Sequence, residues 1–433
     1  MKANAELRVY ILGVMLCVAL AMCSRHFGDR GGRPFMAWLT LACIAYLLAA
    51  WQLFSTPGFS RRVVVIGLVL AAVSQVAFLR LPPGPNDDIH RYVWDGRLQR
   101  LGYNPYIVIP SDPAVSLLHT AETRNLNNPD LPSPYPPGAQ LFFRAVTAIR
   151  ESAFALKVAF VICAFGIAVV LRDLLRNSGR GTHLILAYAW NPLLAIEVAG
   201  SGHIDILGAL LLTISVATLA RRWRAIAALT LGLAVAVKFL PIVLLPLYWK
   251  RIRLRDAALS AGLIGLLYLP FLDRGRLPIG SLATYVRTFR FNGPVFASLA
   301  SVAPPQLLAG LAVLVGFATS VLLRRANEQW SLDVFAWPMA ASLLCSPVVF
   351  PWYLLWLLPF LTSASTMLIL LWTLSIIPTY VMWHLSALRG SWGELPGWAM
   401  LTEYGILAIA AGITIVRRIN RSAAIECSSG RQA

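Results

Sequence analysis

Acidic residues are scarce in this chain. Its 433 residues include 19 Asp and Glu against 37 Lys and Arg, and charged residues of both signs make up only 13%. Soluble globular domains carry about 25% charged residues, so this composition excludes an ordinary soluble protein. Hydrophobic residues make up 58%, and charge-free windows of roughly 17 to 22 residues recur, the length an α-helix needs to cross a bilayer. The sequence therefore predicts an all-α, polytopic membrane protein.

Cysteine is also rare, and its spacing excludes two classes of protein. Five of the six cysteines fall inside apolar stretches and none shows the close spacing of a metal site. A disulfide framework and a zinc-binding motif are therefore not expected. The net charge of +18 does not indicate nucleic-acid binding, because most arginines lie in short clusters between apolar stretches. Membrane topology and anionic lipid require that pattern.

Long apolar stretches follow one another along the whole chain. They predict a bundle of about 12 to 14 transmembrane segments that forms a single domain over residues 1–433. The candidate spans are residues 9–24, 35–54, 63–79, 153–171, 183–199, 204–220, 225–248, 257–272, 305–323, 333–348, 351–363, 366–384 and 397–416.

Clusters of basic residues indicate which ends of the spans face the cytoplasm. The clusters are Arg61 and Arg62, Arg172 to Arg180, Arg221 to Arg224, Lys250 to Arg255, Arg324 and Arg325, and Arg417 to Arg421. This topology places the two long non-apolar segments, 80–152 and 273–304, outside the cytoplasm. The basic loop 25–33 does not fit the rule.

One apolar stretch conflicts with this topology. A single helix over residues 225–248 would put two basic clusters on opposite sides of the membrane. Lys238 lies near the middle of the stretch and Pro241 follows three residues later. Because proline interrupts a helix, we expect two half-length helices in a re-entrant hairpin whose tip points to the outer face.

The stretch 86–106 concentrates chemistry in the outer loop. It follows a Pro-Pro-Gly-Pro turn, and Asn86 or Asp87 is a suitable helix N-cap while Gly102 is a suitable stop. These signals predict a helix from about 88 to 101. The i, i+3, i+4, i+7 spacing puts four polar side chains on one face of that helix: Asp88, Arg91, Tyr92 and Asp95.

Further polar residues interrupt the apolar sequence on the same predicted face of the membrane. Ionisable groups placed in lipid cost several kcal/mol unless they are paired or solvated, so they are candidate functional residues. They are Glu197, His203 and Asp205 in a turn after Trp190-Asn191-Pro192, Lys238, Arg287 and Arg290 with Asn292, and the aromatic pair Trp352 and Tyr353.

These residue types suit transfer of a group from a lipid phosphate. Asp88 is the candidate general base, and Asp87 or Asp95 would position the acceptor or support a cation. Lys238, His203, Arg287 and Arg290 are candidates to neutralise a phosphate. Arg91, Tyr92, Asp205, Trp352 and Tyr353 complete the candidate substrate-binding set.

Each candidate also has a structural alternative. Asp87 would only cap a helix, Asp88 would be a surface charge, and Asp95 would be a partner for Arg91. His203 and Asp205 would only end a turn between spans, and Lys238 would pair with Glu197. Trp352 and Tyr353 would belong to an interfacial aromatic belt.

The sequence DIHRYVWDGR from Asp88, with GYNPY from Gly102, resembles the first outer loop of polyprenyl-phosphate-dependent GT-C glycosyltransferases. Bacterial mannosyltransferases are the most similar members. The blocks Trp190-Asn-Pro, Gly202-His-Ile-Asp, Val237-Lys-Phe-Leu-Pro and Pro351-Trp-Tyr-Leu-Leu-Trp are similar, in the same order, to later blocks of that family.

This resemblance implies a GT-C fold in a bacterial cytoplasmic membrane, with the active site facing outward. It implies inverting transfer of a hexose, mannose in the most similar members, from a polyprenyl-phosphate carrier to a glycolipid or glycan acceptor. The base carboxylate would be Asp88. No cofactor is expected, and Asp87 beside the motif aspartate leaves dependence on a divalent metal open.

A multi-pass transporter or lipid-linked sugar flippase is the main alternative. Such a protein also has many spans, charges in the membrane and a broken helix. We find no paired halves of similar pattern, and an outer loop of about 70 residues rich in acidic and aromatic residues favours chemistry at the membrane surface. A purely structural subunit is disfavoured by the clustered Asp residues.

Overall fold

Helices form almost the entire protein. The computed structural model describes residues 2–84, 87–124, 126–273, 277–326 and 331–429, with side chains from Ala3 to Arg417. In these ranges the β-structure is limited to isolated bridge residues, including the pair Phe291 and Val348. Eight helices of the described chain are long and apolar enough to cross a membrane. The predicted all-α, polytopic membrane architecture is therefore confirmed.

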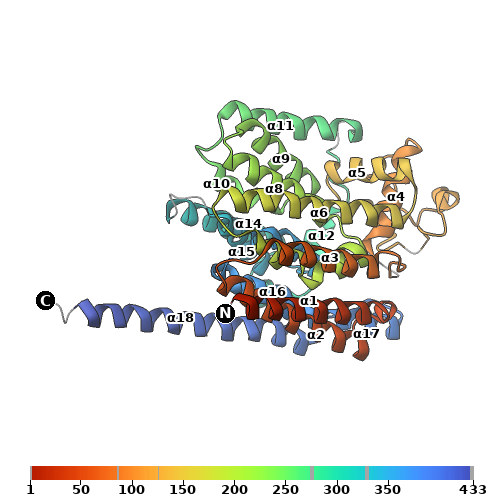
Figure 1. Cartoon of the computed structure of the whole chain (residues 1–433). Helices are drawn as coiled ribbons and strands as arrows, with labels where there is room; N and C mark the ends of the chain where they lie inside the picture. Colours follow the sequence, from red (N-terminus) through yellow and green to blue (C-terminus); the bar gives the residue numbers. More distant parts are fainter. Residues whose placement is uncertain (1, 85–86, 125, 274–276, 327–330, 430–433) are drawn as a thin grey trace.

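The long apolar helices lie roughly parallel to one another (Figure 1). They are α1 (Lys2–Ser24), α2 (Arg33–Ser55), α3 (Arg61–Leu79), α6 (Ala153–Asn177), α11 (Leu254–Tyr268), α14 (Pro305–Ala326), the stretch formed by α16 (Met367–Ser375) and α17 (Val381–Arg389), and α18 (Gly397–Ser429).

Shorter apolar helices account for the difference from the 12 to 14 predicted spans. Three are α8 (Asp205–Ala220), α9 (Arg224–Val237) and α15 (Ala336–Leu344), the last preceded by η7 (Leu332–Phe335). The predicted span 183–199 is instead bent by 58° between Thr182–Ala189 and Leu194–Ser201. The predicted span 351–363 is broken into the short turns η8 (Pro351–Trp356) and η9 (Leu358–Phe360), where proline opens each turn and prevents a continuous helix.

The chain reverses direction at Lys238, as the basic clusters require. Helix α9 ends at Val237, and η5 (Leu240–Leu244) and α10 (Leu245–Tyr248) follow. The Ser215 hydroxyl contacts both the Ala227 carbonyl at 2.6 Å and the Tyr248 hydroxyl at 2.8 Å. The start of α9 and the end of α10 therefore lie side by side, and the predicted reversal within 225–248 is confirmed.

The described residues of the segment 80–152 lie at one end of the bundle, at the right of Figure 1. It contains α4 (Asp88–Arg100), η2 (Pro113–Leu118) and α5 (Pro137–Ile149). The buried Lys157 ammonium donates to the carbonyls of Phe78 and Leu81, at 3.2 and 2.7 Å. This contact helps to cap α3, because it supplies a donor to carbonyls at the helix end, where the Phe78 carbonyl also accepts from the Leu81 backbone N–H at 3.1 Å. It fixes where the segment begins.

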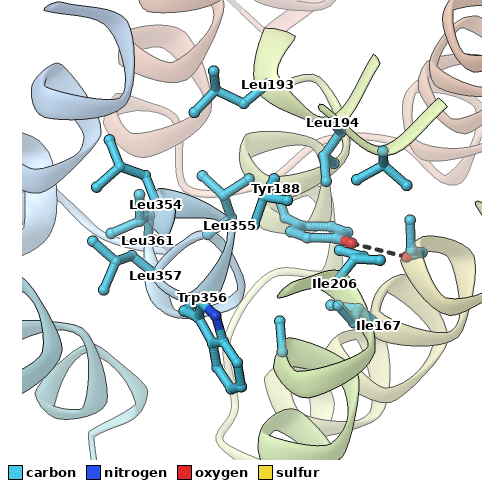
Figure 2. Packing of buried hydrophobic residues seen from close by; sticks show 14 of the residues in the cluster. Ile167, Tyr188, Leu193, Leu194, Ile206, Leu354, Leu355, Trp356, Leu357 and Leu361 are labelled. Atoms are coloured by element: carbon cyan, nitrogen blue, oxygen red, sulfur yellow. Dashed lines mark hydrogen bonds between the residues drawn. The ribbon is translucent and has the colours of Figure 1, made fainter. Parts of the chain in front are cut away.

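The core beside the cavity described below packs η8 and η9 against α6, η4 (Leu194–Ser201) and α8 (Figure 2). Tyr188 donates its hydroxyl to the Ala164 carbonyl at 2.9 Å. Trp356 packs on Gly208, where an added Cβ would lie 2.0 Å from the indole ring. The absence of a side chain at Gly208 thus lets α8 and η8 approach each other closely.

The second long segment contains α12 (Leu282–Thr288) and α13 (Pro294–Leu299). It is joined to the chain before η8 by backbone hydrogen bonds from Phe291 to the Pro347 carbonyl, at 3.0 Å, and from Val349 to the Phe291 carbonyl, at 2.8 Å. The amide of Asn292 also donates to the buried Glu403 of α18 at 2.8 Å. The segment therefore covers the same end of the bundle as α4.

Candidate active site

Helix α4 begins at Asp88, as predicted, and ends within one residue of the predicted boundary. Asn86, the other proposed cap, lies outside the described residues. Asp87 occupies the N-cap position without a side-chain capping bond. Its carboxylate instead accepts from the Arg30 guanidinium at 2.8 Å and from the Gly84 backbone N–H at 2.7 Å. The capping interpretation of Asp87 is therefore wrong.

Arg30 explains the basic loop 25–33 that did not fit the topology rule. Its side chain is buried and pairs with the equally buried Asp87, with exposed side-chain fractions of 4% and 3%. A buried cation needs such a partner, because an isolated one would cost several kcal/mol. Sequence reasoning missed Arg30, and the misfit of its loop was the available signal.

The Asp88 carboxylate faces a cavity. Its side chain is 19% exposed, and it accepts a hydrogen bond of 2.6 Å from the Asn127 amide. The Nδ1 atom of His203 lies 3.8 Å from its second oxygen. Asp88 thus combines access to the cavity with a hydrogen bond from Asn127 and a nearby imidazole ring.

Asp95 lies on the same helix but belongs to a buried network. Its carboxylate accepts from Arg91 at 3.0 Å, from Ser133 at 2.5 Å and from Gln140 at 2.9 Å. It is fully buried and does not line the cavity, whereas Arg91 does. The geometry matches the structural alternative for Asp95, a partner for Arg91.

Tyr92, predicted to share the polar face, is buried as well. Its ring stacks on Phe143 with centroids 4.4 Å apart. It therefore packs α4 against α5 and does not line the cavity.

His203 is positioned by the π-helix η4. The Glu197 carbonyl accepts from the backbone N–H groups of both Gly202 and His203, at 3.0 and 2.9 Å. Gly202 has a φ of +79°, and an added Cβ would lie 2.5 Å from Ile89 of α4. Only glycine tolerates both the left-handed conformation and this close contact. The end of η4 is thereby pressed against α4, which brings His203 to Asp88.

His203 lies between two carboxylates. Its Nε2 atom is 3.0 Å from Glu197, and both side chains are almost fully buried. The Nε2 atom of His203 and the Glu197 Oε2 atom are close enough for an ion pair. Their geometry is not that of a hydrogen bond, and neither atom makes a hydrogen bond elsewhere among the described residues. Glu197 also accepts a hydrogen bond from the Tyr380 hydroxyl. In the sequence Glu197 is a polar residue among apolar neighbours. In the structure its contact with His203 connects it to the site.

Lys238 pairs with Asp205, not with Glu197. Its ammonium donates to Asp205 at 2.7 Å and lies 3.8 Å from the centre of the Tyr353 ring. The indole N–H of Trp356 donates to the same Asp205 oxygen at 2.8 Å. The alternative prediction that Lys238 pairs with Glu197 is therefore wrong. Lys238 lines the cavity and its side chain is 24% exposed.

Four stacked rings form one side of the site. The ring centroids are 3.9 Å apart for His203 and Trp352, 4.3 Å for Trp352 and Phe350, and 4.4 Å for Phe350 and Phe291. Trp352 is only 7% exposed, so it is not part of an aromatic belt in lipid. Tyr353 shares a hydrogen bond of 2.6 Å with Tyr285. Trp352 and Tyr353 both line the cavity.

The two predicted arginines of the outer segment are not brought together at the site. Arg290 lines the cavity, while Arg287 does not. The Arg290 guanidinium donates to the carbonyls of Phe289 and Arg287, at 2.5 and 2.8 Å. Partial burial lowers the pKa of Arg290 below its usual value. Of the two arginines predicted to help Lys238 neutralise a phosphate, Arg290 is the one that lines the cavity.

The cavity has a volume of about 640 Å³, within the range of about 300 to 1,000 Å³ that small-molecule sites occupy. It is lined by the start of α4, residues 127–136, α12, residues 289–291 and 348–353, and residues 390–392. Of the sequence-predicted site residues it brings together Asp87, Asp88, Arg91, His203, Lys238, Arg290, Trp352 and Tyr353. Among the described side chains, no group of three or more His, Cys, Asp and Glu has the arrangement of a metal site.

A membrane bundle in which a carboxylate and a cation face one aromatic-walled cavity defines a membrane-embedded group-transfer enzyme. The chain belongs to the family described as alpha-(1->6)-mannopyranosyltransferase, N-terminal domain, whose sequence profile matches residues 10–251, more than half of its 433 residues. The protein is thus a mannosyltransferase. No curated protein matches it, and no solved structure does so.

The matched region divides the site into two parts. It contains Asp88, His203, Asp205 and Lys238, whereas Arg290 and the ring wall from Phe350 to Tyr353 lie beyond it. The carboxylates and the lysine therefore belong to the part shared with the family.

Proposed function

We propose that the enzyme transfers mannose from a polyprenyl-phosphate carrier to a hydroxyl of a glycolipid or glycan, with inversion at the anomeric carbon. The product linkage would be α-(1→6), the linkage in the family description. The observation that carries the proposal is Asp88, a carboxylate open to the cavity and held between Asn127 and His203. A general base needs this combination of access and fixed orientation.

In the proposed reaction, Asp88 takes the proton of the acceptor hydroxyl. The acceptor oxygen forms a bond to C1 of mannose while the bond from C1 to the phosphate oxygen breaks. Polyprenyl phosphate leaves with the bonding electrons, so negative charge develops on the phosphate. A preorganised cation aimed at that oxygen stabilises the transition state.

Lys238 is the cation proposed for that task, because its ammonium reaches the cavity and Asp205 fixes its position at 2.7 Å. Asp205 is itself held by Trp356 and acts as a positioning residue. The exposed Arg290 at the cavity edge is proposed to attract the anionic carrier and to place its phosphate.

His203 is proposed as a positioning residue for Asp88. A buried carboxylate such as Glu197 needs a polar neighbour. The His203 ring supplies one, because it lies 3.0 Å from Glu197 on one side and 3.8 Å from Asp88 on the other. This arrangement keeps the base carboxylate oriented without a metal ion. Asp87 is paired with Arg30, so the adjacent aspartates do not offer two free carboxylates to one cation.

The proposed location is a bacterial cytoplasmic membrane, with the cavity at its outer face and the enzyme serving the cell envelope. This rests on the basic clusters at the other end of α8 and α9. Impermeant thiol labelling tests it: a cysteine at Ser111 should be labelled from outside, and cysteines at Arg224 and Arg255 only from inside. Labelling of the Arg224 and Arg255 positions from opposite sides would overturn the topology.

The activity is tested with the purified protein and a panel of polyprenyl-phosphate sugars. We expect a new mannoside from the mannose donor and much less product from glucose or galactose donors, with Asp88→Asn as the inactive control. A transporter or flippase would move the lipid-linked sugar and form no glycoside. Absence of any glycoside from every donor, with folded protein, would contradict the proposed function.

A further inference from the structure

A second cavity lies at the opposite end of α8 and α9. Its volume is about 860 Å³. Lys238 and Asp205 lie at one end of these helices, and Arg221 and Arg224 at the other, a separation of about 20 to 24 Å at 1.5 Å per residue. Basic side chains from several segments surround this cavity: Arg180, Arg221, Arg222, Arg224, Lys250 and Arg251. Asp333 is the acidic residue among the described residues that line it.

Among the described residues, the cations that line this cavity outnumber the acids that pair with them. Arg180 lies 3.4 Å from Asp333, and Arg221 lies 2.5 Å from Asp173. Burial, and then the positive charge of Arg324, lower the pKa of Arg251. Like charges gathered in one concavity repel each other, so a bound anion would relieve the repulsion.

Two of these cations occupy a backbone conformation that disfavours them. Arg222 and Lys250 have φ values of +62° and +60°. This left-handed region suits glycine, and other L-residues adopt it only at an energetic cost. Both residues follow a helix end, where glycine is the common choice. Strain of this kind gathers at functional sites, and both strained residues line this cavity.

Exposed tryptophans flank the same two residues. Trp223 is 54% exposed and Trp249 is 71% exposed. They adjoin Arg222, Arg224 and Lys250 in the sequence. Tryptophan concentrates at the boundary between hydrocarbon and lipid headgroups. This position puts the basic cavity at the headgroup level, with the exposed apolar side chains Ile226, Leu245 and Leu254 beside it.

We propose that this basic cavity binds the phosphate headgroup of an anionic phospholipid whose acyl chains lie along the adjacent apolar surface. Basic pockets of membrane proteins at the cytoplasmic headgroup level recognise such lipids. A free phosphate would meet the same cations but would leave the exposed tryptophans and apolar side chains without a role. The proposal is independent of the proposed sugar donor, because it concerns the other end of the protein.

The test uses the full-length protein in a neutral detergent, titrated with phosphatidylglycerol or phosphatidylcholine and followed by native mass spectrometry. The variant Arg222→Gly/Lys250→Gly removes two cations and places glycine where the backbone favours it. We expect the wild type to retain phosphatidylglycerol in preference to phosphatidylcholine. The glycine variant should bind phosphatidylglycerol about 30-fold more weakly, the effect of losing two cations near an anionic headgroup.

A matched control removes two cations elsewhere. Arg61 and Arg62 are exposed at the start of α3 and do not line the cavity, so Arg61→Gln/Arg62→Gln should bind phosphatidylglycerol like the wild type. Should the glycine variant not fold, Arg222→Asn/Lys250→Asn replaces it, because asparagine also tolerates a positive φ.

Three outcomes would overturn the proposal. Equal weakening in the control variant would mean that only the net charge matters. Unchanged phosphatidylglycerol binding in the glycine variant would remove the cavity from lipid binding. Displacement of the lipid by inorganic phosphate or pyrophosphate at equal concentration would indicate a site for a free anion.

Discussion

The two ends of the protein handle charge in opposite ways. At the active-site end, cations are paired with carboxylates: Arg30 pairs with Asp87, Arg91 with Asp95, and Lys238 with Asp205. At the basic end, six lining cations share one lining acid among the described residues. The net charge of +18 is therefore concentrated away from the chemistry.

This difference follows from burial. The paired groups at the active-site end are mostly less than 5% exposed, and a buried charge needs a partner of opposite sign. At the basic end Arg222, Arg224 and Lys250 are exposed, so burial does not require a partner for them. The positions of the few acidic residues therefore help to locate the active site, because in this chain several of them pair with buried cations there.

Apart from loss of the proposed base Asp88, the largest effect should follow from removing Lys238. Lys238→Met is expected to lower kcat by about 10²- to 10³-fold, the usual cost of losing a group that stabilises developing negative charge. Steady-state mannose transfer measures this. The variant Lys238→Met/Asp205→Asn decides between roles. If Lys238 only neutralises Asp205, the double variant regains activity, and if Lys238 meets the donor phosphate, it stays inactive.

A second large effect is expected on stability and not on chemistry. Asp95→Asn leaves Arg91 buried with a neutral partner, so the free energy of unfolding should fall by about 3 to 5 kcal/mol. Denaturant unfolding measures this, with the exposed Asp130→Asn as a control within about 0.5 kcal/mol of the wild type. If folded Asp95→Asn instead kept full stability and lost turnover, Asp95 would belong to the catalytic machinery.

The smallest effect should come from the ring wall. Trp352→Ala removes the ring stacked between His203 and Phe350. Such ring pairs contribute about 0.5 to 1.5 kcal/mol each to the rigidity of the wall. Because Trp352 also lines the cavity, we expect KM for the acceptor to rise by no more than about tenfold, the effect of a loss of that size in binding, with a smaller change in kcat. Trp398→Ala, at an exposed position of α18, should leave both constants unchanged. A loss in kcat alone would argue against a substrate platform.

Local signals in the sequence predicted some elements well. The helix at Asp88 follows from a cap position, a stop glycine and their spacing, all within one short stretch. The reversal at Lys238 follows from proline and from charge clusters at both ends of one apolar stretch. The helix depends on interactions between near neighbours in the sequence. The reversal depends on the rule that basic clusters stay on one side of the membrane.

Pairings between distant segments could not be predicted. Arg30 and Asp87 are 57 residues apart, and Lys238 and Asp205 are 33 apart. Nothing in the local pattern selects Asp205 over Glu197 as the partner of Lys238. The interruption of the predicted span 351–363 was missed as well, because apolar composition alone does not distinguish a continuous helix from the buried turns η8 and η9.

The central claim is that Asp88 is the base, and turnover of Asp88→Asn tests it most directly. Asparagine keeps the shape and can still contact Asn127 and His203, so the melting temperature should stay that of the wild type. The account predicts a fall in kcat of about 10²- to 10⁴-fold for mannose transfer, with KM for the donor little changed. Near-normal turnover in the folded Asp88→Asn variant would contradict it.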